Sequence, residues 1–82
     1  MSHIYSKTIS IKTVETAKQI AYITTQYDED IDLISGRYVV DAKSIISIFA
    51  LDLLKPITIN IHTEDESKAN SLFKELEQIG VK

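Results

Sequence analysis

The sequence has no cysteine and no tryptophan, and only one proline and two glycines among its 82 residues. Without cysteine the chain cannot form a disulfide, a thiolate nucleophile or a cysteine-ligated metal site. The scarcity of proline and glycine leaves little material for a flexible linker. A chain of this length has room for one hydrophobic core, so we expect a single domain over residues 1–82.

Dense positive charge and long hydrophobic runs are also missing. The sequence has nine Lys and Arg residues and twelve Asp and Glu residues, which gives a net charge of −3. This balance argues against nucleic acid or an anionic membrane as the main partner, because both require a dense basic face. The longest apolar stretch, residues 45–54, is interrupted by Ser47 and Asp52 and is too short to span a membrane. Residues 1–7 lack the apolar core of a signal peptide, so we expect a cytoplasmic protein.

The first half of the sequence changes from a strand-like to a helix-like hydrophobic period. Residues 4–11 are rich in β-branched side chains and end in an apolar–polar alternation, which predicts a strand. Thr13 is then expected to cap a helix, with Glu15 in the first turn, where the helix dipole favours a negative charge. The predicted buried stripe of this helix consists of Val14, Ala17, Ile20, Ala21, Thr24 and Tyr27. The acidic run at 27–30 ends the helix.

The middle of the chain predicts a hairpin followed by a short helix. Strands at 31–34 and 37–40 flank Ser35-Gly36, which is typical of a tight turn. Ser44 is placed to cap a helix over residues 45–51, which is apolar on nearly all sides.

The last third predicts one more strand and one more helix. Residues 57–62 alternate cleanly, with the three isoleucines on one face. Thr63 and Glu66 have the spacing of a capping box before a helix that Gly80 ends. The predicted order is β-α-β-β-α-β-α, and one buried face per element indicates a two-layer α+β sandwich.

The sequence resembles HPr, the histidine-containing phosphocarrier of the bacterial sugar phosphotransferase system. The stretches that carry the resemblance are 27–33, 35–37, 40–45, 57–59 and 64–66. The most specific is Lys43-Ser44-Ile45, which looks like the segment around the regulatory serine of HPr from Gram-positive bacteria. The resemblance implies an open-faced sandwich in which a four-stranded antiparallel sheet carries three helices on one face.

The phosphorylation motif of that family is lost here. The family has Gly, an aliphatic residue, His, any residue, Arg, Pro and Ala, whereas residues 11–17 agree only at Ala17. Thr13 stands in the place of the phosphorylated histidine and Glu15 in the place of the arginine. A threonine phosphate ester is a poor phosphoryl donor, and Glu15 brings a negative charge where a guanidinium would bind the phosphoryl group. We therefore expect no phosphohistidine carrier, no enzyme and no cofactor.

Ser44 is the best remaining candidate for a functional residue. The resemblance implies phosphorylation of this serine by an ATP-dependent kinase, and a natural HPr variant that lacks the histidine keeps the serine and acts with a transcriptional regulator. The alternative interpretation is that Ser44 only caps the short helix.

A docking surface is predicted beside Ser44. We expect Ile48 and Leu51 to face the core, which leaves Ile45, Ile46 and Phe49 partly exposed. The family's equivalents of these three residues form its docking patch for proteins, so the expected partner is a regulator, a kinase or a phosphotransferase-system protein. Exposed aliphatic residues are also common on any protein, which is the alternative.

The remaining polar clusters predict no metal site. The acidic runs 28–30 and 64–66 lack the ligand pattern of a calcium loop and are expected to be solvated, and His3 and His62 have no metal-ligand spacing. Tyr38 could stack a nucleic-acid base, but the net charge and the single Arg argue against an RNA platform.

The leading functional hypothesis is therefore a degenerate HPr-like interaction module in which Ser44 phosphorylation gates partner binding. One alternative is a non-canonical phosphotransferase-system component that interacts with enzyme I or a sugar permease. The other is a small α+β domain that binds a metabolite or forms an oligomer.

Overall fold

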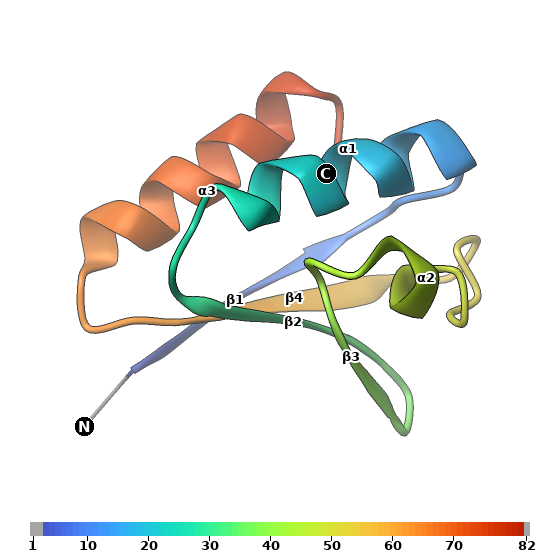
Figure 1. Ribbon diagram of the computed structural model, residues 1–82, viewed down its shortest axis with the longest axis horizontal. Coiled ribbons are helices and arrows are strands. Elements are labelled where there is room, and N and C mark those ends of the chain that lie inside the picture. Colours follow the sequence, from blue (N-terminus) through green and yellow to red (C-terminus); the bar gives the residue numbers. More distant parts are fainter. Residues whose placement is uncertain (1–2, 82) are drawn as a thin grey trace.

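The computed structural model describes residues 3–81 (Figure 1). Seven elements follow in the predicted order: β1 Ile4–Ile9, α1 Val14–Thr25, β2 Asp30–Ser35, β3 Tyr38–Asp41, α2 Ile45–Ile48, β4 Ile57–His62 and α3 Glu66–Gln78. Residues 1 and 2, part of the stretch considered for a signal peptide, lie outside the described residues. Within residues 3–81, no helix combines the length and the apolar character needed to cross a membrane.

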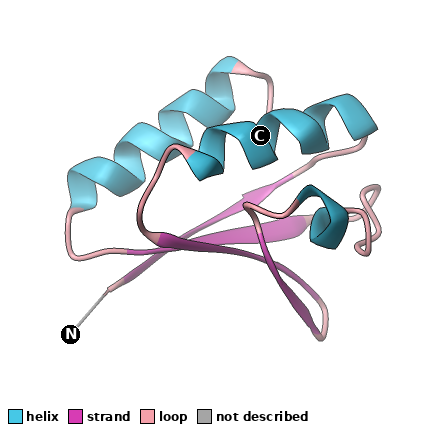
Figure 2. Cartoon of the chain, in the orientation of Figure 1, coloured by secondary structure: helices cyan, strands magenta, loops and turns pink. Residues whose placement is uncertain are grey.

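The four strands form one sheet in the order β1-β4-β2-β3, and every neighbouring pair is antiparallel. Helices α1 and α3 lie side by side over one face of this sheet, and α2 lies over the β3 end of the same face (Figures 1 and 2). In the described part of the chain, no helix covers the opposite face of the sheet (Figure 1). The predicted open-faced α+β sandwich is thus confirmed.

The hydrophobic core lies between the sheet and the helices, as the sequence periods predict. Ile57, Ile59 and Ile61 of β4 are fully buried and point toward the helices. The helix α1 buries most of its predicted stripe. Val14 is an exception, because it lies half exposed at the first position of the helix, and Ile23 is buried although it was not expected to be.

Two elements are shorter than predicted. The first strand ends at Ile9, and three residues further on Lys12 adopts a positive φ of 68°. Its N–H donates to the carbonyl oxygen of Leu53 at 2.8 Å, while Ile11 stays in the core without belonging to the strand. The short helix α2 ends at Ile48 rather than at residue 51.

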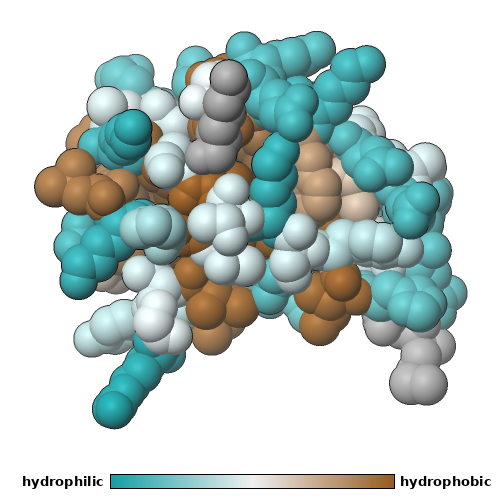
Figure 3. Space-filling view, turned by 180° about the vertical axis from the view of Figure 1, so that it is seen from behind, coloured by the Kyte–Doolittle hydropathy of each residue, from teal (hydrophilic) through white to brown (hydrophobic). Residues whose placement is uncertain are grey.

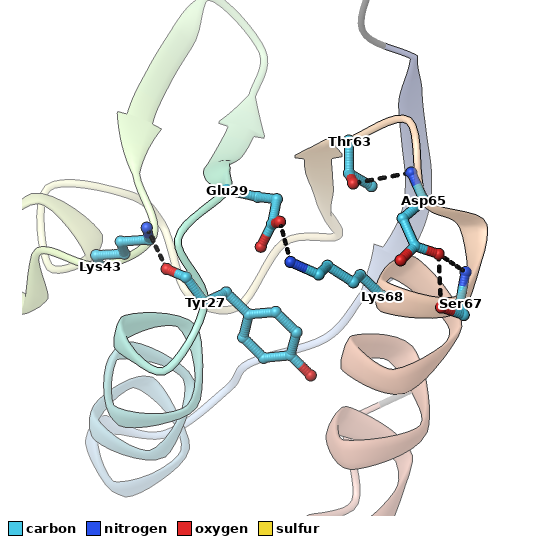
Figure 4. Close-up of polar contacts among 7 residues, drawn as sticks. All are labelled: Tyr27, Glu29, Lys43, Thr63, Asp65, Ser67 and Lys68. Atoms are coloured by element: carbon cyan, nitrogen blue, oxygen red, sulfur yellow. Dashed lines mark hydrogen bonds and ion pairs between the residues drawn. The ribbon is translucent and has the colours of Figure 1, made fainter.

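The cap of α3 also differs from the prediction. Asp65, and not Thr63, is the N-cap, and its Oδ1 accepts the N–H of Ser67 at 3.0 Å (Figure 4). Thr63 instead accepts the N–H of Asp65 at 3.0 Å, one step before the helix. The Ser67 hydroxyl, which also donates to Asp65, lowers the pKa of this carboxyl group. An Asp at the N-cap satisfies a free backbone donor directly, so the Thr63–Glu66 capping box is not formed.

Candidate functional site

Thr13 lies at the position that the HPr resemblance assigns to the phosphorylated histidine. Its backbone is extended, and its Oγ1 accepts the N–H of Thr16 at 3.1 Å, as expected for an N-cap residue. The Thr13 hydroxyl also donates to the Thr16 hydroxyl at 2.9 Å. The side chain is exposed at the start of α1, with Glu15 exposed two residues further on.

A small hollow of about 330 Å³ lies beside Thr13. The backbone enters it through a tight turn, because the Thr13 N–H donates to the carbonyl oxygen of Ile11 at 2.8 Å across Lys12. The lining residues are Ser10, Ile11, Lys12, Thr13, Thr16 and Gly80. The described lining residues therefore offer hydroxyl groups and one ammonium group, but neither an imidazole that could take up a phosphoryl group nor a guanidinium.

The two histidines lie away from this hollow. His62 ends β4 and is paired with Ile4, the first residue of β1, whereas Thr13 lies beyond the last residue of β1. The six residues of β1 separate the two positions by roughly 17 Å of strand. His3 is exposed, with its ring 6.5 Å from the ring of Tyr5. Neither imidazole lies beside Thr13.

His62 has a partner that the sequence did not indicate. Its Nε2 lies 2.8 Å from Oδ2 of Asp32, and both side chains are about one third exposed. The two residues meet because Asp30 is the register partner of His62 and Asp32 lies one pleat away on the same face. Within residues 3–81, no group of three His, Cys, Asp or Glu side chains is arranged to hold a metal ion.

Ser44 is the N-cap of α2, as predicted. Its Oγ accepts the N–H of Ser47 at 3.4 Å and lies 3.1 Å from the Ser47 hydroxyl. Asp41 holds the preceding turn by accepting the N–H of Lys43 at 2.9 Å, and the Lys43 ammonium donates to the carbonyl oxygen of Tyr27 at 2.6 Å (Figure 4). Because α2 has only four residues, the dipole that its N-terminus would offer a phosphate is weaker than expected for the predicted helix.

Three apolar residues form a surface beside Ser44, which we call the α2 surface: Ile45, Ile46 and Phe49. Ile46 is 80% exposed and Phe49 is 44% exposed, whereas Ile45 is partly buried against the core. On the inner side of this segment, Ile48 and Leu51 are buried, as predicted. The docking role of the α2 surface remains a prediction.

The α2 surface continues onto α1, which the sequence did not indicate. A shallow hollow of about 410 Å³ lies between the two helices, lined by Lys18, Ala21, Tyr22, Thr25, Lys43 and Ile45. Tyr22 is exposed beside it. Two lysines thus border an apolar surface on a chain whose net charge is −3.

Exposed apolar side chains are not confined to α2. Among residues 3–81, the other exposed large hydrophobic residues are Ile4, Val14, Tyr22, Tyr38, Val39 and Leu54. On the face seen in Figure 3, hydrophobic residues gather in separate brown patches among hydrophilic ones. Exposure alone therefore does not mark a docking site, and the α2 surface is distinguished by its position beside Ser44 and by the adjoining hollow.

A polar cluster joins the segment after α1 to α3 (Figure 4). Glu29 was expected to be solvated, but its side chain is only 15% exposed and lies 2.7 Å from the Lys68 ammonium. The hydrogen bond from Lys68 lowers the pKa of Glu29, and the same bond raises the pKa of Lys68. Burial raises the pKa of Tyr27, whose hydroxyl donates to Glu75 at 2.7 Å. This cluster links the segment after α1 to α3. Its two contacts join side chains that are 39 and 48 residues apart in the sequence.

Solved structures identify the fold. No family model matches the sequence, and no curated protein matches it either. The histidine-containing phosphocarrier protein of a mycoplasma superposes with a TM-score of 0.69 and 20% identity, over 93% of this chain and 94% of that one. HPr-C-His from Thermoanaerobacter tengcongensis superposes with a TM-score of 0.67 and 20% identity, over 88% and 89% of the two chains. The chain therefore has the HPr fold, as the sequence resemblance implied.

Proposed function

We propose that this chain is a single-domain, cytoplasmic protein-interaction module with the HPr fold, that it has no catalytic activity and that it does not carry phosphohistidine. The observation that carries the proposal is that an exposed threonine, Thr13, caps α1 where the resemblance places the phosphorylated histidine. A phosphoryl relay needs a group that gives up its phosphoryl readily, and a threonine ester does not.

The surroundings of Thr13 support the same conclusion. Glu15 is exposed in the first turn of α1, where its negative charge would repel a phosphoryl group. The imidazole of His62 is bonded to Asp32 near the other end of the sheet. The fold therefore keeps its shape while the chemical group of a phosphocarrier is absent from the expected position.

The proposed binding site is the α2 surface, and the proposed occupant is a protein with an apolar contact area bordered by carboxylates. Ile46 and Phe49 supply exposed apolar area that gains by burial against a partner. Lys18 and Lys43 border this area and favour acidic side chains on the partner. A transcriptional regulator, a kinase or a phosphotransferase-system protein fits this description.

Phosphorylation of Ser44 is proposed to gate this contact. A phosphate adds about −1.5 to −2 charges at neutral pH, and Ser44 adjoins Lys43 and the α2 surface. The added charge reverses the local positive sign, so a partner with carboxylates at its rim is disfavoured and one with basic residues is favoured. The short α2 contributes little to this effect, which rests mainly on charge.

Incubation with enzyme I and phosphoenolpyruvate tests the loss of the relay. Intact-mass spectrometry should show no phosphoryl group on this chain, while an authentic HPr in the same mixture gains one. A phosphoryl group on Thr13 or His62 would contradict the proposal.

The docking surface and the switch need separate experiments. Phe49→Asp should abolish capture of a partner that is identified by mass spectrometry, whereas Val39→Asp, which places the same charge at an exposed apolar position on the opposite face of the sheet, should retain it. An HPr kinase with ATP should add one phosphate to the wild type and none to Ser44→Ala. Equal capture of the partner by the two Asp variants would contradict the docking proposal. If the kinase adds no phosphate to the wild type, the proposed gating by Ser44 phosphorylation is wrong.

A further inference from the structure

A third hollow lies near the β2–β3 turn. Its volume is about 640 Å³, which is larger than that of either hollow described above. One wall is the hairpin, with Gly36, Arg37 and Tyr38, and the other is the loop after α2, with Asp52 and Lys55. Both walls lie at the same end of the molecule (Figure 1). This hollow shares no residue with the hollow beside Thr13 or with the α2 surface.

The charged groups in this hollow suit an anion. Arg37 is the one arginine of the sequence, and within the described residues neither its guanidinium nor the Lys55 ammonium has a hydrogen-bond or ion-pair partner. The single carboxylate of the lining, Asp52, already accepts the N–H of Leu54 at 3.1 Å through Oδ1. Two cations against one carboxylate leave a net positive charge in a concave site, where the field on an anion is stronger than on a flat surface.

The walls are held in place before any ligand arrives. The Lys55 N–H donates to the carbonyl oxygen of Asp52 at 3.2 Å, and the carbonyl oxygen of Leu53 accepts the Lys12 N–H at 2.8 Å. On the other wall, Gly36 takes a positive φ of 59°, which fixes the tight hairpin turn. A preformed site binds at a lower entropic cost than one that must order its loops.

We propose that this hollow binds a nucleoside monophosphate, with the phosphate on Arg37 and Lys55 and the base on the ring of Tyr38. A guanidinium presents paired donors that match phosphate oxygens. The Tyr38 side chain is 66% exposed and lies on the helix side of β3, next to the cations. A ring with a free face supports stacking of a base. A single phosphate needs only the charge of this hollow, whereas an RNA strand needs a longer basic surface that the chain lacks.

Titration of the ¹⁵N-labelled protein with AMP, ribose 5-phosphate and inorganic phosphate tests the proposal. AMP should give saturable amide shifts confined to the two walls of the hollow, with a dissociation constant below about 1 mM. Ribose 5-phosphate and inorganic phosphate should bind at least about threefold more weakly, because they lack the base that stacks on Tyr38.

Variants separate the contributions of charge and ring. Arg37→Gln should weaken AMP binding about tenfold, whereas Lys74→Gln, which removes one charge from an exposed position on α3, should leave it unchanged. Tyr38→Leu should lower the affinity for AMP to that for ribose 5-phosphate. The proposal is overturned if AMP causes no saturable shift up to about 20 mM, if the two charge variants behave alike, or if ribose 5-phosphate binds the wild type as tightly as AMP.

Discussion

Replacement of Ser44 by alanine tests how much this residue stabilises the protein as the N-cap of α2, apart from its proposed regulatory role. Loss of an N-cap side chain costs about 0.5–2 kcal/mol in proteins. The cap bond from Ser47 is long, at 3.4 Å, and α2 has only four residues. Both features place Ser44→Ala at the lower end of the range, at about 0.5–1 kcal/mol of unfolding free energy.

The magnitude is large enough to measure and small enough to keep the protein folded. For a chain of this size, 0.5–1 kcal/mol corresponds to a fall in Tm of about 2–8 °C. Ser44→Asp keeps an oxygen that can accept the Ser47 N–H, so we expect its Tm to stay within about 2 °C of the wild type. Thermal unfolding by circular dichroism, with urea unfolding as an independent measurement, gives both values.

Ser47→Ala is the matched control, because it removes the hydroxyl that contacts Ser44 but keeps the backbone N–H that the cap binds. Its expected loss is less than about 0.5 kcal/mol. If Ser44→Asp loses as much stability as Ser44→Ala, the side-chain oxygen does not cap α2 and the reasoning is refuted. The Ser44→Ala protein remains a valid negative control for the kinase assay only if its loss stays within the expected range.

Three further predictions concern stability. Thr24 is fully buried and its hydroxyl lies 2.9 Å from the carbonyl oxygen of a loop residue before α2, so Thr24→Val should cost about 1–2 kcal/mol in urea unfolding. Lys68 lowers the pKa of Glu29, so the contribution of Glu29 to the unfolding free energy is present above its unfolded pKa of about 4.3 and is lost as pH falls through its lower folded pKa. The Tm of Glu29→Gln should therefore decline less steeply in acid than the Tm of the wild type. Ile46→Ala should change the unfolding free energy by less than about 0.5 kcal/mol, whereas Ile48→Ala, at a fully buried position on the same helix, should cost about 2–4 kcal/mol.

Each of these predictions has a control in the chain. Thr25→Val changes the same group at an exposed position and should cost less than about 0.5 kcal/mol. Glu15→Gln removes the same formal charge as Glu29→Gln from an exposed side chain that has no contact with Lys68, and it should change the acid decline less than Glu29→Gln does. Similar losses for the two isoleucine variants would mean that the α2 surface packs inside the protein, and the docking proposal would then fail.

The sequence predicted those parts of the fold that depend on local patterns. The alternation in β4 places three isoleucines in the core, and Thr13 and Ser44 cap the helices that follow them. These features depend on residues only a few positions apart, so a single sequence shows them. The cap of α3 was assigned to Thr63 instead of Asp65, because two neighbouring residues both have suitable side chains and only the backbone path decides between them.

Contacts set by sheet register or helix packing were beyond the sequence. Asp32 and His62 meet because β2 and β4 are neighbours in the sheet, although 30 residues separate them. Glu29 is covered because α3 packs near the end of α1 and brings Lys68 to it. The hollow beside Tyr38 likewise needs the hairpin turn and the loop after α2 to lie face to face. None of these pairs has a spacing that would reveal it.

The arrangement shows that the HPr fold does not depend on the residue that occupies position 13. Thr13 and Glu15 are exposed at the start of α1 and contribute a cap and a surface charge, whereas the core is made by the inward faces of the strands and helices. Replacing an imidazole at such a position removes no buried contact, so the chemistry can be lost at little cost to stability. The α2 surface is equally independent of the core, apart from the partly buried Ile45. The proposed change of function, from phosphoryl transfer to partner binding, would therefore leave the core of this fold intact.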